Sequence, residues 1–449
     1  MGRWNAVFID SIKAHARRRV RRLLMDFGIS KLKHSLRALE SRNYRLFFAG
    51  QAISLIGSWM TQVATIWLVY HLTNSAWLLG FVGFAGQIPS FILSPFGGIL
   101  VDRWNRHRIL IITQILAMIQ SFALAILALT GIIHISHIIL LSIFQGFIMA
   151  FDSPARQAFV TEMVDKKEDL GNAIALNSSI FNGARLVGPA IAGLLIASVG
   201  AGACFLIDGL SYIAVIAGLL AMKLKPREIA VQTTNVWQRL KEGFIYAFGF
   251  PPIRAILLLL ALFSFMGMPY TVLVPIFATK ILHGGADTLG FLMAASGVGA
   301  LIGGIYLSSR QTVIGLGKVI AFSPAILGIG LVIFSQSRIL WLSLLMMLIV
   351  GCASILQIAS SNTFLQTIVE DDKRGRLMSW YTMSFLGILP FGNLAAGALA
   401  SRIGAPDTIM IGGFCCVLGS LVFAKQLPEL RRLIRPIYTK IGLISKASS

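Results

Sequence analysis

Charged residues are scarce in this chain. Only 13% of its 449 residues are Asp, Glu, Lys or Arg, whereas 56% are hydrophobic; soluble domains average roughly 25% charged residues. The mean hydropathy is +0.79. Nearly uncharged runs of about 20 residues recur along the whole sequence, as in transmembrane helices. The composition therefore excludes a soluble globule and predicts an all-α polytopic membrane protein.

Cysteine and acidic residues are also few. The four cysteines lie in apolar runs without a CxxC pair, which predicts small core residues rather than disulfides or metal ligands. Eighteen acidic residues stand against 39 basic ones, giving a net charge of +21. In a soluble protein this excess would suggest nucleic acid. In a membrane protein it predicts basic cytoplasmic loops, so we expect no nucleic-acid partner.

Several chemical signatures are missing. The sequence has no GxxxxGK[ST] phosphate loop, no Ser/His/Asp or Cys/His arrangement and no histidine spacing typical of a metal site. The first 45 residues contain no apolar stretch followed by a small-residue cleavage site. We therefore expect no enzymatic activity, ATP-driven step, metal, cofactor or cleaved signal peptide.

Hydropathy divides the chain into twelve apolar segments. Each is long enough to cross a hydrocarbon core of about 30 Å as a helix, the conformation that satisfies backbone hydrogen bonds in lipid. The predicted spans are 46–70, 76–101, 109–131, 136–158, 172–198, 203–222, 255–281, 287–309, 317–335, 339–362, 376–401 and 406–425.

Lysine and arginine set the expected orientation. With the N-terminus inside, the inner segments hold 35 of these residues and the outer loops hold three. This bias predicts that both termini are cytoplasmic, because basic loops stay on that side. Residues 7–27 carry an arginine cluster that either lies on anionic lipid or belongs to a loosely ordered tail.

The second half of the chain repeats the first at a period of about 204 residues. With one gap, five glycines from Gly171 to Gly200 align with five from Gly375 to Gly404, and Gly193 aligns with Gly397. Six helices repeated in one orientation imply two bundles that rock about a central cavity. The predicted domains are a basic cytoplasmic segment (1–45), a six-helix bundle (46–222), a cytoplasmic linker with an amphipathic helix (223–254), a second bundle (255–425) and a basic cytoplasmic tail (426–449).

The loop after the second span, residues 98–108, reads GILVDRWNRHR. It resembles the signature loop of the major facilitator superfamily, in which Gly, three further residues and Asp-Arg are followed by a basic cluster. The resemblance implies a conformational latch formed by Gly98, Asp102, Arg103 and Arg106. In such a latch the Asp102 carboxylate binds a helix N-terminus of the other bundle, with residues 374–376 as candidates. Positive-inside anchoring alone would explain the arginines but not Asp102.

The fourth span ends in a second group of charges. Asp152 and Arg156 lie four residues apart on one helical face and can pair, and Glu162 follows. Resemblance to the superfamily implies that these residues join the charges around Asp102. A local interfacial salt bridge is the alternative.

Two charged residues fall inside spans. Arg185 lies near mid-membrane, where a charge should face water, a partner or substrate. It precedes Gly188, Pro189 and Gly193, which resemble the antiporter motif GPxxGG of superfamily exporters or simply form a kinked, tightly packed helix. Asp208 lies one to two turns below the outer face of the sixth span. Burial there suits proton exchange, and a structural hydrogen bond is the alternative. Because their predicted depths differ by roughly 12 Å, we do not expect Arg185 and Asp208 to pair.

The central helices of this architecture would be spans 1, 4, 7 and 10. Their amides, aromatics and methionines favour a bulky, partly aromatic, neutral or anionic ligand over an inorganic ion. Each of these residues singly is also compatible with helix packing. The candidate cavity residues are Gln51, Trp59, Gln62, Gln145, Met266, Tyr270, Gln357 and Asn362.

Residues 42–60 (RNYRLFFAGQAISLIGSWM) look like the opening of bacterial transmembrane secretion effectors, a group that includes the enterobactin exporter. Residues 172–179 and 185–189 are similar to its fifth span. The resemblance covers about residues 40–425. It implies a twelve-helix exporter of the bacterial inner membrane, driven by protons.

The leading functional prediction is a proton-coupled secondary exporter of a small organic molecule, with a siderophore preferred. Multidrug efflux and lysophospholipid transport stay open, as does a non-transporting membrane sensor or assembly platform. The expected partners are a small-molecule substrate, protons and membrane lipid, and we expect a monomer.

Overall fold

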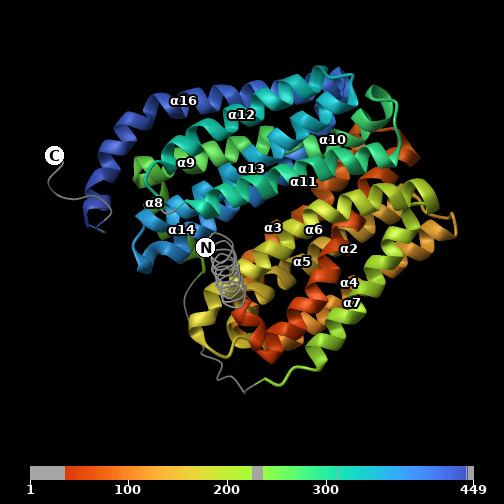
Figure 1. The fold of residues 1–449 in the computed structure, drawn as a ribbon, viewed down its shortest axis with the longest axis horizontal. Helices are drawn as coiled ribbons and strands as arrows, with labels where there is room; N and C mark the ends of the chain where they lie inside the picture. Colours follow the sequence, from red (N-terminus) through yellow and green to blue (C-terminus); the bar gives the residue numbers. More distant parts are fainter. Residues whose placement is uncertain (1–35, 225–235, 311, 441, 443–449) are drawn as a thin grey trace, which may run out of the picture.

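The computed structural model describes residues 36–224, 236–310, 312–440 and 442. These residues form two groups of helices that lie side by side (Figure 1). The arginine cluster at residues 7–27, for which lipid binding and a loosely ordered tail are the two predictions, lies outside the described residues.

In the described part of the chain, twelve helices are long and apolar enough to cross a membrane. This confirms the number of spans predicted from hydropathy. The first six are α2 (Arg42–Thr73), α3 (Ala76–Arg103), α4 (Arg106–Leu129), α5 (Ile135–Met163), α6 (Leu170–Val199) and α7 (Ala201–Leu220). The last six are α9 with α10 (Pro251–Leu262, Tyr270–Ile276), α11 (Ala286–Ser309), α12 (Leu316–Gln336), α13 (Leu340–Ile368), α14 with α15 (Asp371–Thr382, Leu389–Ile403) and α16 (Ala405–Lys440).

Each half of the chain packs as a bundle of its own. In the first, α2 packs on α6 and α7, α3 on α5, and α4 on α5 and α7. In the second, α11 packs on α13, and α12 on α13 and α16. The pairing of α3 with α5 recurs as that of α11 with α13, and the pairing of α4 with α7 recurs as that of α12 with α16. The repeat seen in the sequence is thus a repeat of architecture.

Most of the contact between the bundles comes from two helix pairs, α3 with α15 and α6 with α11. In both pairs glycines let the backbones touch. A Cβ added at Gly193 would lie 2.8 Å from the Cα of Gly290, and one at Gly80 would lie 2.7 Å from the Cα of Gly397. Gly193 and Gly397 are equivalent in the sequence repeat, so the two contacts are equivalent as well.

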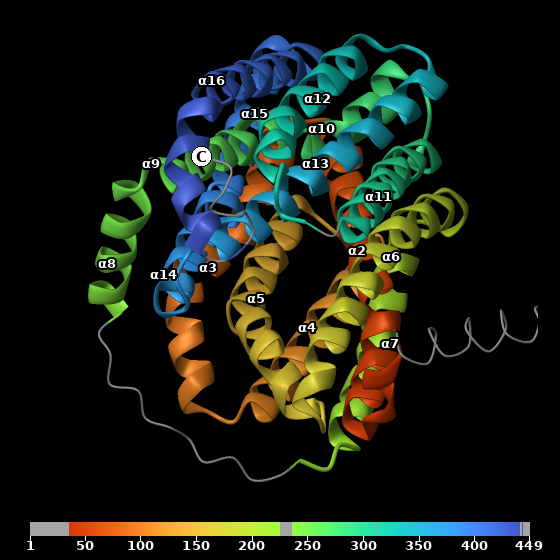
Figure 2. The ribbon, with the colours of Figure 1, turned by 60° about the vertical axis from the view of Figure 1, so that its left-hand side comes forward.

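These glycine contacts lie on one side of the molecule. We call the side of the molecule where α2 begins and α16 ends the terminal side, and the opposite side the far side. Both glycine contacts lie near helix ends on the far side. Toward the terminal side the bundles diverge, so that α5 and α6 stand apart from α14 (Figure 2). The conformation is therefore closed by the glycine contacts on the far side.

Two of the spans are interrupted. π-helical turns occur at Phe263–Gly267 and Phe277–Ile281 in the seventh span and at Met383–Gly387 in the eleventh. Pro269 and Pro390 follow two of them, and proline cannot donate a helical hydrogen bond. The Ser264 hydroxyl donates to the carbonyl of Phe385, which joins two of these turns. Irregular turns of this kind are frequent at functional sites.

The linker between the bundles contains α8 (Val236–Gly249), which packs on α14. The rings of Phe244 and Phe248 lie 5.1 Å and 5.8 Å from that of Trp380, and Glu242 pairs with Arg376 at 3.0 Å. The helix predicted near residues 235–250 thus rests on the second bundle. The last helix, α16, continues to Lys440 and so includes much of the segment expected to be a basic tail.

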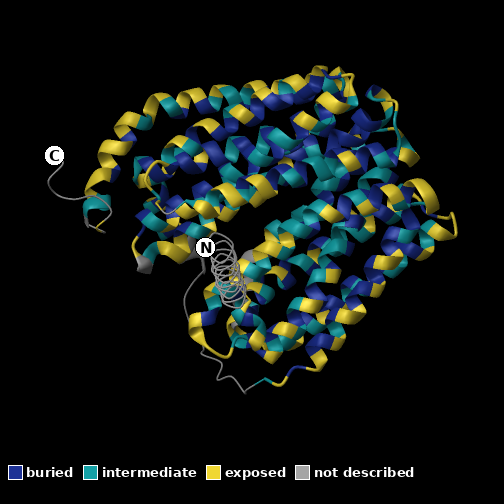
Figure 3. Ribbon diagram, in the orientation of Figure 1, coloured by how far each residue is buried: buried dark blue, intermediate teal, exposed yellow. Residues whose placement is uncertain are grey.

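Exposed residues occur along the helices of both bundles (Figure 3). Many of them are large apolar side chains. Leu140, Ile213 and Leu418, for example, are 65%, 50% and 61% exposed. Such a surface is unstable in water and matches the hydrocarbon of a membrane.

We predict that Gly290→Leu destabilises the far-side contact. A Cβ at this position would lie 2.7 Å from both the Cα of Gly193 and the carbonyl oxygen of Pro189, so the helices must separate. Overpacking of this kind costs about 1–3 kcal/mol. The thermal unfolding midpoint of the purified protein in detergent should fall. Gly304→Leu, on the same helix with no atom within 4 Å of the added Cβ, should leave it unchanged; equal midpoints for both variants would contradict the account.

Candidate functional site

Asp208, on α7, is buried between three helices and is 1% exposed. Its Oδ2 accepts hydrogen bonds from Thr61 Oγ1 on α2 at 2.8 Å and from Ser121 Oγ on α4 at 2.9 Å. Its Oδ1 is buried and has no hydrogen-bond partner in the described chain. The structure forms no ion pair to Asp208 within the described residues. The carboxyl group is therefore held by hydroxyls without a counter-charge.

Small residues on α2 create the space for this carboxyl group. Gly57 and Thr61 are four residues apart and share one helical face. A Cβ on Gly57 would lie 3.0 Å from the Cα of Asp208 and 2.7 Å from its Oδ1. Only glycine lets α2 and α7 approach this closely, so the position of Asp208 depends on the sequence of α2.

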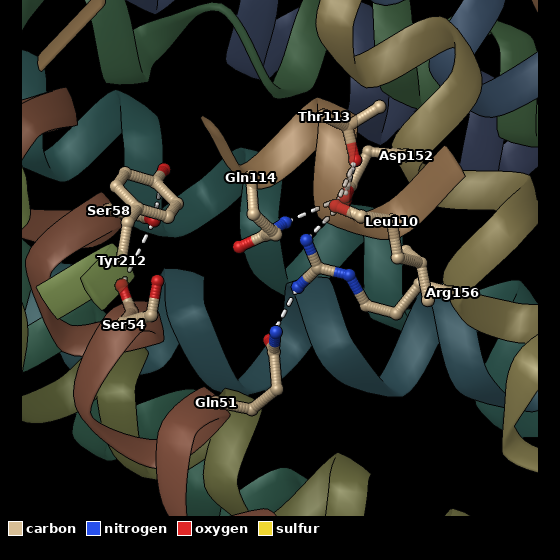
Figure 4. Close-up of polar contacts among 9 residues, drawn as sticks. All are labelled: Gln51, Ser54, Ser58, Leu110, Thr113, Gln114, Asp152, Arg156 and Tyr212. Carbon is tan, nitrogen blue, oxygen red and sulfur yellow. Dashed lines mark hydrogen bonds and ion pairs between the residues drawn. The ribbon is translucent and has the colours of Figure 1, made fainter. Parts of the chain in front are cut away.

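A second polar cluster lies toward the terminal side of the same bundle. Asp152, on α5, is 2% exposed, pairs with Arg156 and accepts from Gln114 Nε2 on α4 at 2.8 Å. Thr113 Oγ1 also donates to Asp152, at 2.9 Å, and Arg156 Nη1 donates to Gln51 Oε1 on α2 at 2.6 Å (Figure 4). The cluster ties α2, α4 and α5 together. The paired charges compensate each other, as a buried ion pair requires.

Tyr212 lies between the two clusters. It follows Asp208 by one helical turn on α7, and its hydroxyl is 3.4 Å from Ser58 Oγ on α2. In Figure 4, Gln114 lies between Tyr212 and Asp152. The Oε1 of Gln114 is buried and has no hydrogen-bond partner in the part of the chain that is described. Polar groups thus continue from Asp208 to Asp152 inside the first bundle.

The predicted latch is only partly described. The backbone of Gly98 and Asp102 belongs to α3, but the surroundings of Gly98 and the side chain of Asp102 lie outside what the structure describes. Arg103 is exposed, and Arg106 pairs with Glu162 at 3.1 Å, which joins α4 to α5. Arg376, in the region expected to receive Asp102, pairs with Glu242 of α8. The latch itself stays a prediction.

Arg185 lies at the middle of α6 and is half-buried. Its guanidinium stands over the Trp59 ring of α2, 5.9 Å from the ring centroid, and Phe181 meets the same ring edge-on at 5.8 Å. Within the described residues the guanidinium forms no hydrogen bond or ion pair. Gly188 packs against Trp59, where an added Cβ would lie 2.6 Å from the Trp59 Cβ. The small residue at Gly188 thus brings α6 onto α2.

Arg185 and Asp208 do not meet. Asp208 contacts the face of α2 formed by Gly57 and Thr61, whereas Arg185 contacts Trp59. Trp59 is two residues from each of these, which places it on the opposite face of the helix. Helix α2 therefore separates the two charged groups, in agreement with the expectation that they would not pair.

The other motif and cavity candidates lie at the interface between the bundles, at exposed or half-buried positions, or in the bundle cores. Pro189 and Gly193 lie where α6 packs on α11. Gln62 is exposed, and Trp59, Gln145, Met266 and Asn362 are half-buried. Gln51, Tyr270 and Gln357 are buried inside the bundles, where they bond Arg156, Ser296 and Ser361 respectively. In this conformation those three side chains belong to the bundle cores.

Sequence reasoning missed the partners of the charged groups. Thr61 and Ser121 are small hydroxyl residues within apolar spans, and nothing in the sequence marks them as partners of Asp208. Phe181 could have been found, because it lies four residues before Arg185 on the same helical face. No group of three or more His, Cys, Asp or Glu that could hold a metal occurs in the described residues.

The fold and this arrangement define a transporter-like membrane protein of the major facilitator type. The solved structure of a nucleoside transporter, NupG, is similar with a TM-score of 0.65 and 15% identity, over 86% of this chain and 98% of that one. The model of the transmembrane secretion effector family matches residues 34–434. The chain belongs to this family.

Curated relatives in this family are transporters of different compounds. A staphyloferrin A transporter of Staphylococcus aureus (strain NCTC 8325 / PS 47) is 27% identical over 84% of this chain and 95% of that protein. Macrolide efflux protein A of Streptococcus pyogenes is 27% identical over 87% and 98%. The enterobactin exporter EntS of Citrobacter koseri is 24% identical over 88% and 94%. The resemblance noted in the sequence is confirmed at the level of the family.

We predict that removing one partner of the buried Asp152–Arg156 ion pair lowers the stability of the protein more than removing both charges does. Asp152→Ala leaves Arg156 without its carboxylate and should lower the free energy of unfolding by about 3–5 kcal/mol. The double variant Asp152→Asn with Arg156→Gln should recover a measurable part of this loss. Unfolding of the purified variants in mixed micelles, followed by tryptophan fluorescence, checks the order. A double variant less stable than Asp152→Ala would contradict it.

Proposed function

We propose that this protein is a proton-coupled secondary exporter of a small organic molecule, preferably a siderophore. The observation that carries the proposal is the pair of bundles joined at equivalent glycine contacts on the far side and diverging on the terminal side. Two bundles related in this way can rock between opposite openings. Relatives named for staphyloferrin A, enterobactin and macrolides support transport of organic molecules.

The proposed orientation places the terminal side in the cytoplasm of a bacterial inner membrane. Support comes from the basic residues: 35 of 39 fall in the segments on that side or in the predicted tails. In this orientation the bundles diverge toward the cytoplasm and meet toward the outside (Figure 2). Substrate would enter there, and a rocking motion that separates the glycine contacts would release it outside.

Asp208 is the proposed proton carrier. Protonation removes a buried negative charge for which the described residues supply no cation. Loss of the proton would strengthen the hydrogen bonds from Thr61 and Ser121, because a charged acceptor binds hydroxyl donors more strongly. These donors belong to α2 and α4. The proton could therefore shift α2 against its neighbours, and the opposite face of α2 carries Trp59.

Multidrug efflux is the second candidate. The macrolide efflux relative favours it, since it shares the same 27% identity with this chain as the staphyloferrin A transporter does. A multidrug pump would move several unrelated dyes out of cells, whereas a siderophore exporter would not.

The first test compares small molecules in cells and medium, with and without this gene, under iron limitation. The proposal predicts that the deletion strain retains a siderophore that the parent strain releases. Mass spectrometry of both compartments checks this. An unchanged siderophore profile would contradict the siderophore assignment, and an unchanged profile of every compound would contradict export.

The second test concerns Asp208→Asn, which keeps the shape of the side chain but cannot carry the proton. In everted membrane vesicles, we predict that accumulation of the compound retained by the deletion strain falls to the level seen without a pH gradient. Asp407→Asn, at an exposed helix start, should transport like the unaltered protein. Full gradient-driven transport by Asp208→Asn would exclude it as the proton carrier.

A further inference from the structure

The guanidinium of Arg185 is a positive charge in the middle of a membrane span without a matching negative charge. It lies 15 residues after the first residue of α6 and 14 before the last. Helices α6 and α2, which surround it, contain no acidic residue at all. In α11, the neighbour of α6 across the bundle interface, the single acidic residue is Asp287 in the first turn.

The described carboxylates on the other helices of the first bundle have partners elsewhere. Asp208 lies behind α2 and is bonded to Thr61 and Ser121. Asp152 is paired with Arg156, and Glu162 with Arg106. Charged residues inside membranes face partners, water or a pathway. Since the described residues offer Arg185 no carboxylate, its guanidinium is available to an anion from another molecule.

The surroundings of Arg185 suit an organic anion. The Trp59 ring lies against one side of the guanidinium, which orients the group without using its hydrogen-bond donors. Five N–H donors in a planar fork match the two oxygens of a carboxylate. Trp59 and Phe181 add aromatic surface, and the exposed Gln62 follows Trp59 by three residues on the same helical face.

The backbone around this site is held from two sides. Gly188 packs against Trp59, and a Cβ added at Gly297 of α11 would lie 2.9 Å from the carbonyl oxygen of Arg185. Arg185 thus lies beside α2 of its own bundle and α11 of the other. An anion bound there would contact the interface at which the bundles move relative to each other.

We propose that Arg185, together with Trp59, binds a carboxylate of the transported molecule, and that the substrates of this protein are organic anions rather than cations. This inference rests on the proposed export function and narrows it. A cationic compound would be repelled by Arg185, and the helices around it supply no carboxylate to bind such a compound. The proposal therefore separates this chain from a pump for cationic drugs.

The experiment compares the medium of the parent strain, a deletion strain and deletion strains that express the unaltered protein, Arg185→Lys, Arg185→Gln or Lys280→Gln. Capillary electrophoresis with mass spectrometry gives the charge of each released compound. We expect the compounds lost on deletion to be anions. Arg185→Lys should restore part of their release and Arg185→Gln none. Lys280→Gln should restore all of it; this control removes an exposed lysine that also stands over an aromatic ring, Tyr70.

The outcomes separate the two proposals. If deletion removes no compound from the medium, export itself is contradicted. If the lost compounds are cations or neutral molecules, export stands and the anion site is overturned, whatever the variants do. If anions are lost but Arg185→Gln restores them fully, the anion site is also overturned. Immunoblots of membranes verify that each variant is present, and the charge of the compounds lost from the deletion strain does not depend on any variant folding.

Discussion

A charge or an unbonded polar group is costly in hydrocarbon, and this constraint determines how every polar residue inside the spans is placed. In the described part of the chain, the backbone satisfies it by forming twelve membrane-spanning helices. The inner charges satisfy it in three ways: Asp152 and Arg156 pair, Asp208 is bonded to hydroxyls, and Arg185 lies half-buried over Trp59. In the first arrangement the protein itself supplies both charges. At Asp208 and Arg185 the described residues supply no opposite charge, and in our proposal a transported proton neutralises Asp208 and a transported anion neutralises Arg185.

Helix α2 connects these incomplete sites. One face, with Gly57 and Thr61, forms part of the Asp208 site, and the opposite face presents Trp59 to Arg185. Small residues make both contacts close: Gly57 admits the Asp208 carboxyl group, and Gly188 admits Trp59. In our proposal, a change in protonation on one side of α2 alters the anion site on the other. The coupling then needs no direct contact between the two charged groups.

The sequence predicts the number of spans and the repeat because hydropathy and glycine spacing reflect properties of single helices. It also predicts that Arg185 and Asp208 do not pair, since depth can be counted along a helix. Rotation about the helix axis is harder to predict. Gln357 and Tyr270 are cavity candidates for which helix packing is the alternative, and in this conformation both are buried in the second bundle. The partners Thr61 and Ser121 depend on how three helices pack, which periodicity within one helix does not reveal.

The central claim is that the two bundles rock as rigid bodies and that the far-side glycine contacts separate when they do. Distances between pairs of spin labels, measured by double electron–electron resonance in lipid nanodiscs, test it. One pair, Trp77 and Ile403, reports on the far side, and the other, Ile174 and Tyr306, reports on the terminal side. All four positions are exposed. Between acidic and alkaline buffer, the account predicts opposite changes: the far-side distance lengthens as the terminal-side distance shortens, while Ile112 to Ile174 within the first bundle stays constant. Distances that all stay fixed, or a change within the first bundle, would contradict it.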